Sequence, residues 1–215
     1  MLLRGTAAAI AGDNANDWIL CDPVSHLIYL AGHPRADLLR QALDQFPDAL
    51  SVIAGWDDAG AIADVLTGWT CDRIHVHTLG RLRLSRPPAV SVSWLRPAEI
   101  ATLDAGGRLL RETLMEACRQ APVAAARVNG RPVSFCFASS QTETLWNVSV
   151  ETPEPFRRKH FGAACASWLM AHYLACGKRP VWGAAESNPA SRYMAEWMGL
   201  VECGQFALFQ CAYGR

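Results

Sequence analysis

The segment "ETPEPFRRKHFGAACASWLMAHYL", residues 151–174, places two prolines, three consecutive cations and a glycine directly before a long apolar run. The preceding stretch "LWNVSV" is typical of a strand that ends at Val150, and Pro153 and Pro155 prevent further sheet pairing. One face of the run repeats at helical spacing, through Phe161, Cys165, Trp168 and His172. The segment therefore predicts a strand, a short loop and a helix that begins near residues 156–158.

Three cations, Arg157, Arg158 and Lys159, lie where this helix is predicted to begin. A helix start carries unpaired backbone N–H groups and the positive end of the helix dipole, so each exposed cation there costs roughly 0.3–1 kcal/mol. A bound anion would offset this cost, and Gly162, which has no Cβ, would let a phosphate or pyrophosphate approach the backbone. The alternative is an exposed basic turn without a ligand, and this stretch alone favours neither.

Two signatures, in this order and at this spacing, resemble the GNAT superfamily of acyl-CoA-dependent N-acetyltransferases. The first is a strand ending in valine before an Arg/Gln-x-x-Gly-x-Gly/Ala loop, and it is matched by Val150, Phe156, Arg157, Gly162 and Ala163. His160 stands where the family usually has its first glycine. The second is a helix opened by asparagine and serine and followed by glycine, matched by Asn188, Ser191 and Gly199. The resemblance covers roughly residues 91–212.

The resemblance implies that two strands part to admit the pantetheine arm of acetyl-CoA, while the loop amides hold its pyrophosphate. The cofactor-binding residues that it implies are Val148, Val150, Arg157, Arg158, Lys159, His160, Phe161, Gly162, Ala163, Asn188 and Ser191. The His160 side chain would either crowd the pyrophosphate or donate a hydrogen bond to it. Asn188 would cap a helix, contact the pantetheine, or do both.

The groups that would move protons are less well defined. Many family members protonate the leaving thiolate with a tyrosine in the second signature, but here that position is Ala195. Tyr193 would point about 200° around the helix, which leaves Ser191 or a water molecule as the candidate acid. Candidate bases follow or precede predicted strands: Glu151, which follows the key strand, Glu143 and Glu186. Glu151 and Ser191 are the catalytic residues that we predict.

Composition excludes several classes of function. Twenty basic residues balance twenty acidic ones, and this balance argues against nucleic-acid or membrane attachment. Eight scattered cysteines without a CxxC pair indicate reduced thiols in the cytoplasm, and the apolar patch near the N-terminus is too short for a signal segment. His75, His77 and Cys71 do not make up a complete zinc set because a fourth ligand is missing, so we expect no metal.

The organisation of the chain changes near residue 91. Before it, short β-rich runs alternate with helical segments, and "RLSRPPAVS", residues 83–91, is the candidate linker. We predict an N-terminal α/β region, residues 1–90, and a GNAT-like domain, residues 91–215. In the second region, "NG" at residues 129–130 and the stretch 200–211 each predict a hairpin. The fold class is α/β, or mixed α+β, with a central mixed sheet flanked by helices; the N-terminal alternation permits a degenerate copy of the same fold.

These observations predict an N-acetyltransferase that transfers an acetyl group from acetyl-CoA to a primary amine of a small-molecule or peptide acceptor. The protein would supply proximity, an oxyanion donor and a desolvated cleft. The alternative is a catalytically silent acyl-CoA sensor or partner-binding module. The sequence leaves open the acceptor, the length of the acyl group and whether the chain forms a homodimer.

Overall fold

The structure of the chain is a computed structural model that describes residues 8–11, 17–23, 25–33, 35–81, 90–103 and 106–211. The chain divides into two compact units, each assembled from separate stretches. The C-terminal unit comprises the described residues of His77–Gly183 and Tyr193–Glu202. The N-terminal unit comprises those of Leu2–Val76, Ala184–Arg192 and Cys203–Arg215.

The first part of the chain alternates strands and helices, as its apolar pattern predicts. Its elements are β1 (Ala8–Ala11), β2 (Trp18–Asp22), β3 (Leu27–Ala31), α1 (Ala36–Gln45), β4 (Ser51–Gly55), the 3-10 turn η1 (Trp56–Asp58), α2 (Ala59–Ala63) and β5 (Trp69–Leu79). In the N-terminal unit the strand order is β1-β2-β3-β4-β11-β5, and β3 and β4 are parallel. The core between this sheet and α1 is apolar and includes Ile19, Ile28, Leu39, Val52 and Phe209.

The second part of the chain is a meander followed by two strand–helix junctions. Its elements are β6 (Ser91–Trp94), α3 (Pro97–Ile100), α4 (Gly107–Gln120), β7 (Ala124–Val128), β8 (Arg131–Gln141), β9 (Leu145–Glu151), η2 (Glu154–Phe156), α5 (Phe161–Ala175), β10 (Arg179–Ala185), α6 (Pro189–Trp197) and β11 (Leu200–Cys211). In the C-terminal unit the order is β5-β10-β9-β8-β7-β6. Strands β9 and β10 pair in parallel, whereas the pairs β6–β7, β7–β8 and β8–β9 are antiparallel.

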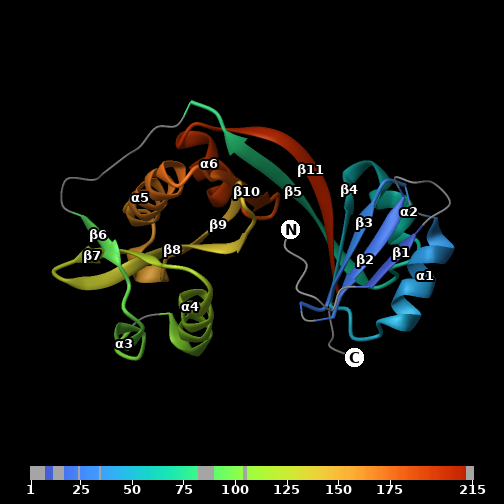
Figure 1. The fold of residues 1–215 in the computed structure, drawn as a ribbon, viewed down its shortest axis with the longest axis horizontal. Coiled ribbons are helices and arrows are strands. Elements are labelled where there is room, and N and C mark those ends of the chain that lie inside the picture. The colour runs from blue at the N-terminus through green and yellow to red at the C-terminus, as the bar shows by residue number, and fades with distance from the viewer. Residues whose placement is uncertain are drawn as a thin grey trace. The chain divides into compact units, whose positions relative to one another are not determined.

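Helices cover both faces of the sheet in the C-terminal unit. Figure 1 shows α5 on one side of β7, β8 and β9, and α3 and α4 on the other. The second face is packed by Leu110 and Leu114 of α4 against Phe135 and Phe137 of β8. Helix α5 is buried around most of its circumference, which explains why its sequence is apolar far beyond one stripe. The prediction of a mixed sheet flanked by helices is confirmed.

The hairpin predicted at residues 129–130 is confirmed, because Asn129 and Gly130 have φ values of 51° and 76° between β7 and β8. The type I′ hairpin turn, which the pair asparagine–glycine favours, requires positive φ at both central residues. The final hairpin is wrong, since residues 200–211 form the single strand β11. Gly204 lies inside this strand and is not among the residues with positive φ, so it makes no turn.

The predicted start of α5 is wrong, and the predicted linker is largely outside the described part of the chain. Helix α5 begins at Phe161 and not near residues 156–158, because Arg158 and His160 adopt left-handed backbone conformations with φ of 59° and 60°. A right-handed helix cannot run through such residues. Most of the predicted linker, its residues 83–89, lies outside the described residues.

The order of elements repeats along the chain. The series β2-β3-α1-β4-α2-β5 has the same order as β8-β9-α5-β10-α6-β11. In each series a helix connects the two strands that pair in parallel, β3 with β4 and β9 with β10. This repeat supports the interpretation of the N-terminal region as a copy of the same fold.

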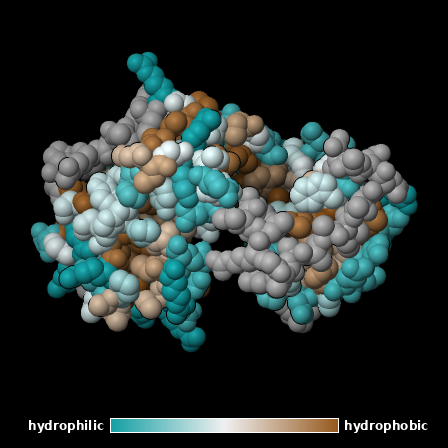
Figure 2. Space-filling view, in the orientation of Figure 1, coloured by the Kyte–Doolittle hydropathy of each residue, from teal (hydrophilic) through white to brown (hydrophobic). Residues whose placement is uncertain are grey.

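The surface has a mixed character. Figure 2 shows hydrophobic residues in small groups among hydrophilic ones on the visible face. Large apolar side chains that are exposed include Leu109 and Tyr193. Among the helices of the described part of the chain, none combines the length and the hydropathy that crossing a membrane would require.

Candidate functional site

The candidate site begins where β9 and β10 stop pairing. The parallel register joins Leu145 to Arg179, Trp146 to Pro180 and Asn147 to Val181, and no later pair is found among the described residues. On its other side β9 stays paired with β8 as far as Glu151. The backbone of residues 148–151 therefore has an edge toward β10 without a strand partner in the described part of the chain. Val148 and Val150, two of the predicted cofactor contacts, lie on this edge.

The loop that follows β9 is held by its own side chains. Arg157 Nε donates a hydrogen bond to the Thr152 carbonyl oxygen at 2.9 Å. Lys159 Nζ donates to the Pro155 carbonyl oxygen at 3.0 Å. Both cations are exposed, as is Arg158 between them. The three charges thus lie together at the start of α5, as predicted, while two of them also brace the loop.

His160 is the N-cap residue of α5 and has φ 60° and ψ 14°. Glycine, the residue that the resemblance implies at this position, would tolerate this left-handed conformation without strain. The imidazole ring lies against Trp197 of α6, with ring centroids 5.7 Å apart. Both roles that the sequence suggests for His160, crowding the pyrophosphate or donating to it, direct the ring at an anion. In the structure the ring packs against Trp197 instead.

The first turn of α5 has no side-chain cap and no acidic residue. The first turn of a helix has N–H groups without an acceptor inside the helix. In α5 these are the amides of Phe161, Gly162 and Ala163. Such a turn, next to three cations, is suited to an anion with several oxygens.

Gly162 has a packing role that the sequence did not reveal. A Cβ at this position would lie 3.0 Å from Val150 Cγ1 and 3.2 Å from Thr152 Oγ1. Gly162 is also buried, so the absence of a side chain lets α5 start close to the end of β9. The prediction that this glycine makes room for an anion receives no support from these contacts.

Glu151, the predicted base, is the last residue of β9. The residue is exposed overall, yet surrounding protein atoms partly desolvate its carboxyl group. This desolvation raises the pKa of Glu151, and the charge of Arg157 partly opposes the rise. A carboxylate with a raised pKa at a strand end is a suitable proton acceptor. Glu143 is an exposed turn residue before β9.

The second signature forms a capped helix start in the N-terminal unit. Asn188 Oδ1 accepts a hydrogen bond from the backbone N–H of Ser191 at 3.1 Å, so Asn188 caps α6 as predicted. Glu186 lies in the same turn, with Oε1 3.8 Å from His75 Nε2 and 3.9 Å from Arg73 Nη1. These separations exceed hydrogen-bond distance, and the Glu186 side chain is half exposed.

The position of the missing tyrosine is closed to substrate. Ala195 is fully buried, whereas Tyr193 is 68% exposed on the same helix. Tyr193 therefore does not take the place of a tyrosine at position 195, as its spacing predicted.

The two histidines of β5 are buried. His75 is 5% exposed and His77 is 0% exposed. Neither ring nitrogen of His77 has a hydrogen-bond partner among the described residues. Within that same part of the chain, no group of three or more potential metal-ligating side chains occurs.

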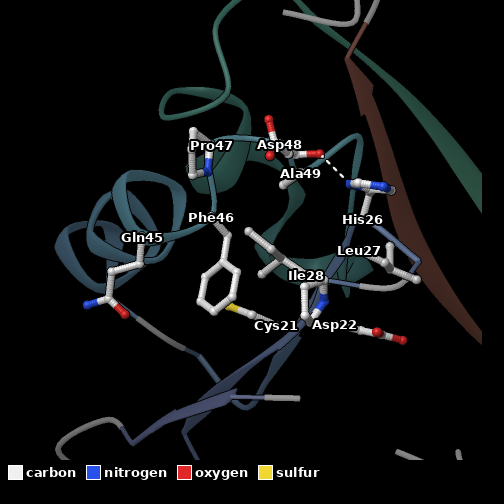
Figure 3. Close-up of a pocket in the computed structure, with 11 residues that line it drawn as sticks. Cys21, Asp22, His26, Leu27, Ile28, Gln45, Phe46, Pro47, Asp48 and Ala49 are labelled. Atoms are coloured by element: carbon white, nitrogen blue, oxygen red, sulfur yellow. Dashed lines mark hydrogen bonds between the residues drawn. The ribbon is translucent and has the colours of Figure 1, made fainter. Parts of the chain in front are cut away.

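A cavity of about 120 Å³ lies in the N-terminal unit, and none of the residues that line it is a predicted site residue. Figure 3 shows the Phe46 ring and the Cys21 sulfur facing each other in its interior, while the Asp22 carboxylate points outward. On its rim His26 Nδ1 lies 3.0 Å from the Asp48 carbonyl oxygen. Burial raises the pKa of Cys21 to about 11, so its thiol is a poor nucleophile.

Comparison with known proteins finds a family model that matches the part of the chain carrying the candidate site. Residues 124–209 match the family model for GNAT acetyltransferases. This match includes β9, the basic loop, α5 and the second signature. No curated protein matches the chain in sequence.

Solved structures share the fold of nearly the whole chain. A GCN5-related N-acetyltransferase from Kribbella flavida has 14% identity and a TM-score of 0.67, covering 96% of this chain and 90% of that one. A GCN5-related N-acetyltransferase-like protein from Streptococcus suis has 16% identity and a TM-score of 0.64, covering 96% and 89%. A tandem GNAT protein from the clavulanic acid biosynthesis pathway has 11% identity and a TM-score of 0.58, covering 98% and 85%.

Proposed function

We propose that this chain, whose C-terminal half carries a GNAT acetyltransferase domain at residues 124–209, transfers an acetyl group from acetyl-CoA to a primary amine. One observation carries the proposal: the unpaired edge of β9 leads directly into the uncapped, basic start of α5. The first feature suits an extended chain of amides, and the second suits a pyrophosphate. Pantetheine and pyrophosphate are joined in this order in acetyl-CoA.

The residues present fit the cofactor. Backbone groups of Val148 and Val150 would pair with the pantetheine amides as an added strand does. The amides of residues 161–163 would hold the pyrophosphate, with Arg158 and Lys159 adding positive charge. Asn188 uses its side-chain oxygen to cap α6, which leaves its amide nitrogen for a pantetheine carbonyl.

Bound acetyl-CoA supplies a thioester carbonyl that an amine can attack. A backbone N–H on the unpaired edge of β9 would stabilise the negative charge that develops on the carbonyl oxygen. Glu151 would accept a proton from the acceptor's ammonium group, directly or through water, because its raised pKa increases its proton affinity. Ser191 or a water molecule would return a proton to the departing thiolate, since Ala195 cannot.

Calorimetric titration with acetyl-CoA tests the cofactor assignment. We expect micromolar affinity that falls at least about tenfold, or about 1.4 kcal/mol, in the double variant Arg158→Glu/Lys159→Glu. Arg108→Glu/Arg119→Glu on α4 is the matched control, because both side chains are exposed and the net charge changes equally. Equal losses in both variants would assign the effect to net charge and reject the loop as the site.

Thiol release in the presence of primary amines then tests the chemistry. Peptides, amino acids and small polyamines are suitable acceptors because the geometry does not select among amine classes. The buried Ala195 favours a second function, acyl-CoA binding without transfer, since the family's usual acid is missing. Tight binding without thiol release for any amine would support this second function.

A further inference from the structure

The repeat gives the N-terminal unit its own counterpart of the cofactor site. Strands β3 and β4 pair in parallel only through Leu27–Ser51, Ile28–Val52 and Tyr29–Ile53, as β9 and β10 pair through three residues. Helix α1 follows β3 just as α5 follows β9. If acetyl-CoA binds as proposed above, the start of α1 is the place where a second molecule would bind. The inference below rests on that proposed function.

Side chains of the unit itself occupy the start of α1. Asp37 is the second residue of α1, the position that Gly162 has in α5. Its carboxylate accepts a hydrogen bond from Arg35 Nε at 3.0 Å. The pKa of Asp37 is lowered first by this arginine and also by the backbone N–H groups of Asp37 and Leu38. The Asp37 carboxylate therefore lies at the helix start that a pyrophosphate would need, and the backbone N–H of Leu38 donates to the Arg35 carbonyl oxygen at 3.1 Å.

A second contact links the loop before α1 to the turn before α2. His33 Nδ1 lies 2.7 Å from Asp58 Oδ1, and the backbone N–H of His33 donates to Asp17 Oδ1 at 2.9 Å. Asp58 immediately precedes α2, as Asn188 immediately precedes α6. A negatively charged aspartate thus replaces the asparagine that is predicted to contact pantetheine.

The backbone at the start of the two helices also differs. Arg35, the N-cap of α1, is extended with φ −65° and ψ 149°. His160, the N-cap of α5, is left-handed. The direction of the backbone groups at the N-cap therefore differs between the two helices, so Arg35 does not present at α1 the backbone conformation that is proposed to hold a pyrophosphate at α5.

We propose that each chain binds a single acetyl-CoA, at the start of α5, and that Asp17, Asp37 and Asp58 close the corresponding position of the N-terminal unit to the cofactor. The physical reason is that a pyrophosphate placed at α1 would meet the Asp37 carboxylate at the helix start and the carboxylates of Asp17 and Asp58 beside the preceding loop, so like charges would repel. The N-terminal copy keeps the order of elements without the cofactor function.

Stoichiometry and site location together test this inference. Acetyl-CoA titrated into the full chain should bind with a stoichiometry of one, measured by calorimetry. In the 15N-labelled protein, the amide signals of residues 161–163 should shift on binding while those of Asp37 and Leu38 stay in place. Arg35→Glu should leave the affinity within about twofold, because Arg35 already pairs with Asp37 and belongs to no cofactor site.

The outcomes separate this inference from the proposed function. Two bound molecules per chain, with shifts at both helix starts, would overturn the single site and leave the proposed function intact. One bound molecule with shifts at Asp37 and Leu38 would overturn both the inference and the assignment to α5. The absence of any binding to the wild-type chain would overturn the proposed function, and the single site with it.

Discussion

His160 shows how one residue combines a backbone constraint with a side-chain contact. Its φ of 60° would suit glycine, yet its ring packs against Trp197 at 5.7 Å between centroids. A left-handed conformation costs a residue with a Cβ roughly 1–2 kcal/mol, and the ring contact returns about 0.5–1.5 kcal/mol. The residue is therefore tolerated because α6 supplies an aromatic partner.

A pair of glycine variants separates these two contributions. Arg158→Gly, at φ 59°, should raise the free energy of unfolding by about 0.5–1 kcal/mol after the greater chain entropy of glycine is subtracted. His160→Gly relieves the same strain but also removes the contact with Trp197, so its gain should be smaller by about 0.5–1 kcal/mol. Urea unfolding followed by fluorescence measures both. A larger gain for His160→Gly would show that the ring contact contributes nothing.

At the scale of elements, an ion pair joins β6, α3 and β7. Arg127 donates from Nη1 to Glu99 Oε1 at 2.8 Å and from Nη2 to Oε2 at 3.0 Å. It also donates to Ser93 Oγ, and Glu99 accepts the backbone N–H of Arg96. Both charged side chains are less than a fifth exposed. Because the carboxylate is paired on every side, its hydrogen bonds lower the pKa of Glu99 to about 2.

Glu99→Gln should lower the free energy of unfolding at neutral pH by about 3 kcal/mol, because it leaves a mostly buried guanidinium without its counter-charge. The pKa of Glu99 is below its ordinary 4.5 in the folded state, so the stabilisation is complete above that pH. It is lost as the pH falls from about 4.5 toward 2. The difference between wild type and variant should therefore shrink over this range in denaturant titrations.

Glu112→Gln is the matched control for this ion pair. Glu112 pairs with Arg108, whose side chain is 88% exposed, so the change should be below about 0.5 kcal/mol. If Glu99→Gln and Glu112→Gln lowered the free energy of unfolding equally, the structural importance of the Glu99–Arg127 contact would be contradicted.

At the scale of the whole molecule, neither unit is a continuous stretch of chain. The five residues of β4 pair with residues 206–210 of β11, which come from the other end of the sequence. Phe209 of β11 is part of the buried core of the N-terminal unit. Conversely, the C-terminal unit includes residues 77–79 of β5, where Thr78 Oγ1 donates to the Pro180 carbonyl oxygen.

The fragment 91–215, which corresponds to the predicted second domain, should not fold alone. It lacks the partner of residues 206–210 and exposes an apolar strand that would promote aggregation. Soluble yield and size-exclusion chromatography measure this outcome. Co-expression with the fragment 1–90 is the control and should restore soluble protein. A monomeric 91–215 fragment with dispersed amide NMR signals would contradict the expectation.

Much of the fold was predictable because its signals are local. The asparagine–glycine turn, the continuous apolar run of α5 and the capping of α6 by Asn188 each depend on residues within a few positions. The signature residues of the candidate site are local in the same sense. The hairpin predicted at residues 200–211 was wrong. Gly204 suggested a turn there, but a glycine without positive φ can remain within a strand.

The sequence by itself determined the order and type of most elements, the cluster of cations before α5 and the family resemblance of roughly residues 91–212. Only the tertiary structure decided that β11 joins the sheet of β4, that β9 and β10 part after three pairs, and that Gly162 packs against Val150. The physical reason is that periodicity and turn chemistry report on neighbours along the chain. Strand partners and close helix–strand contacts depend on residues far apart in sequence, whose meeting no local pattern records.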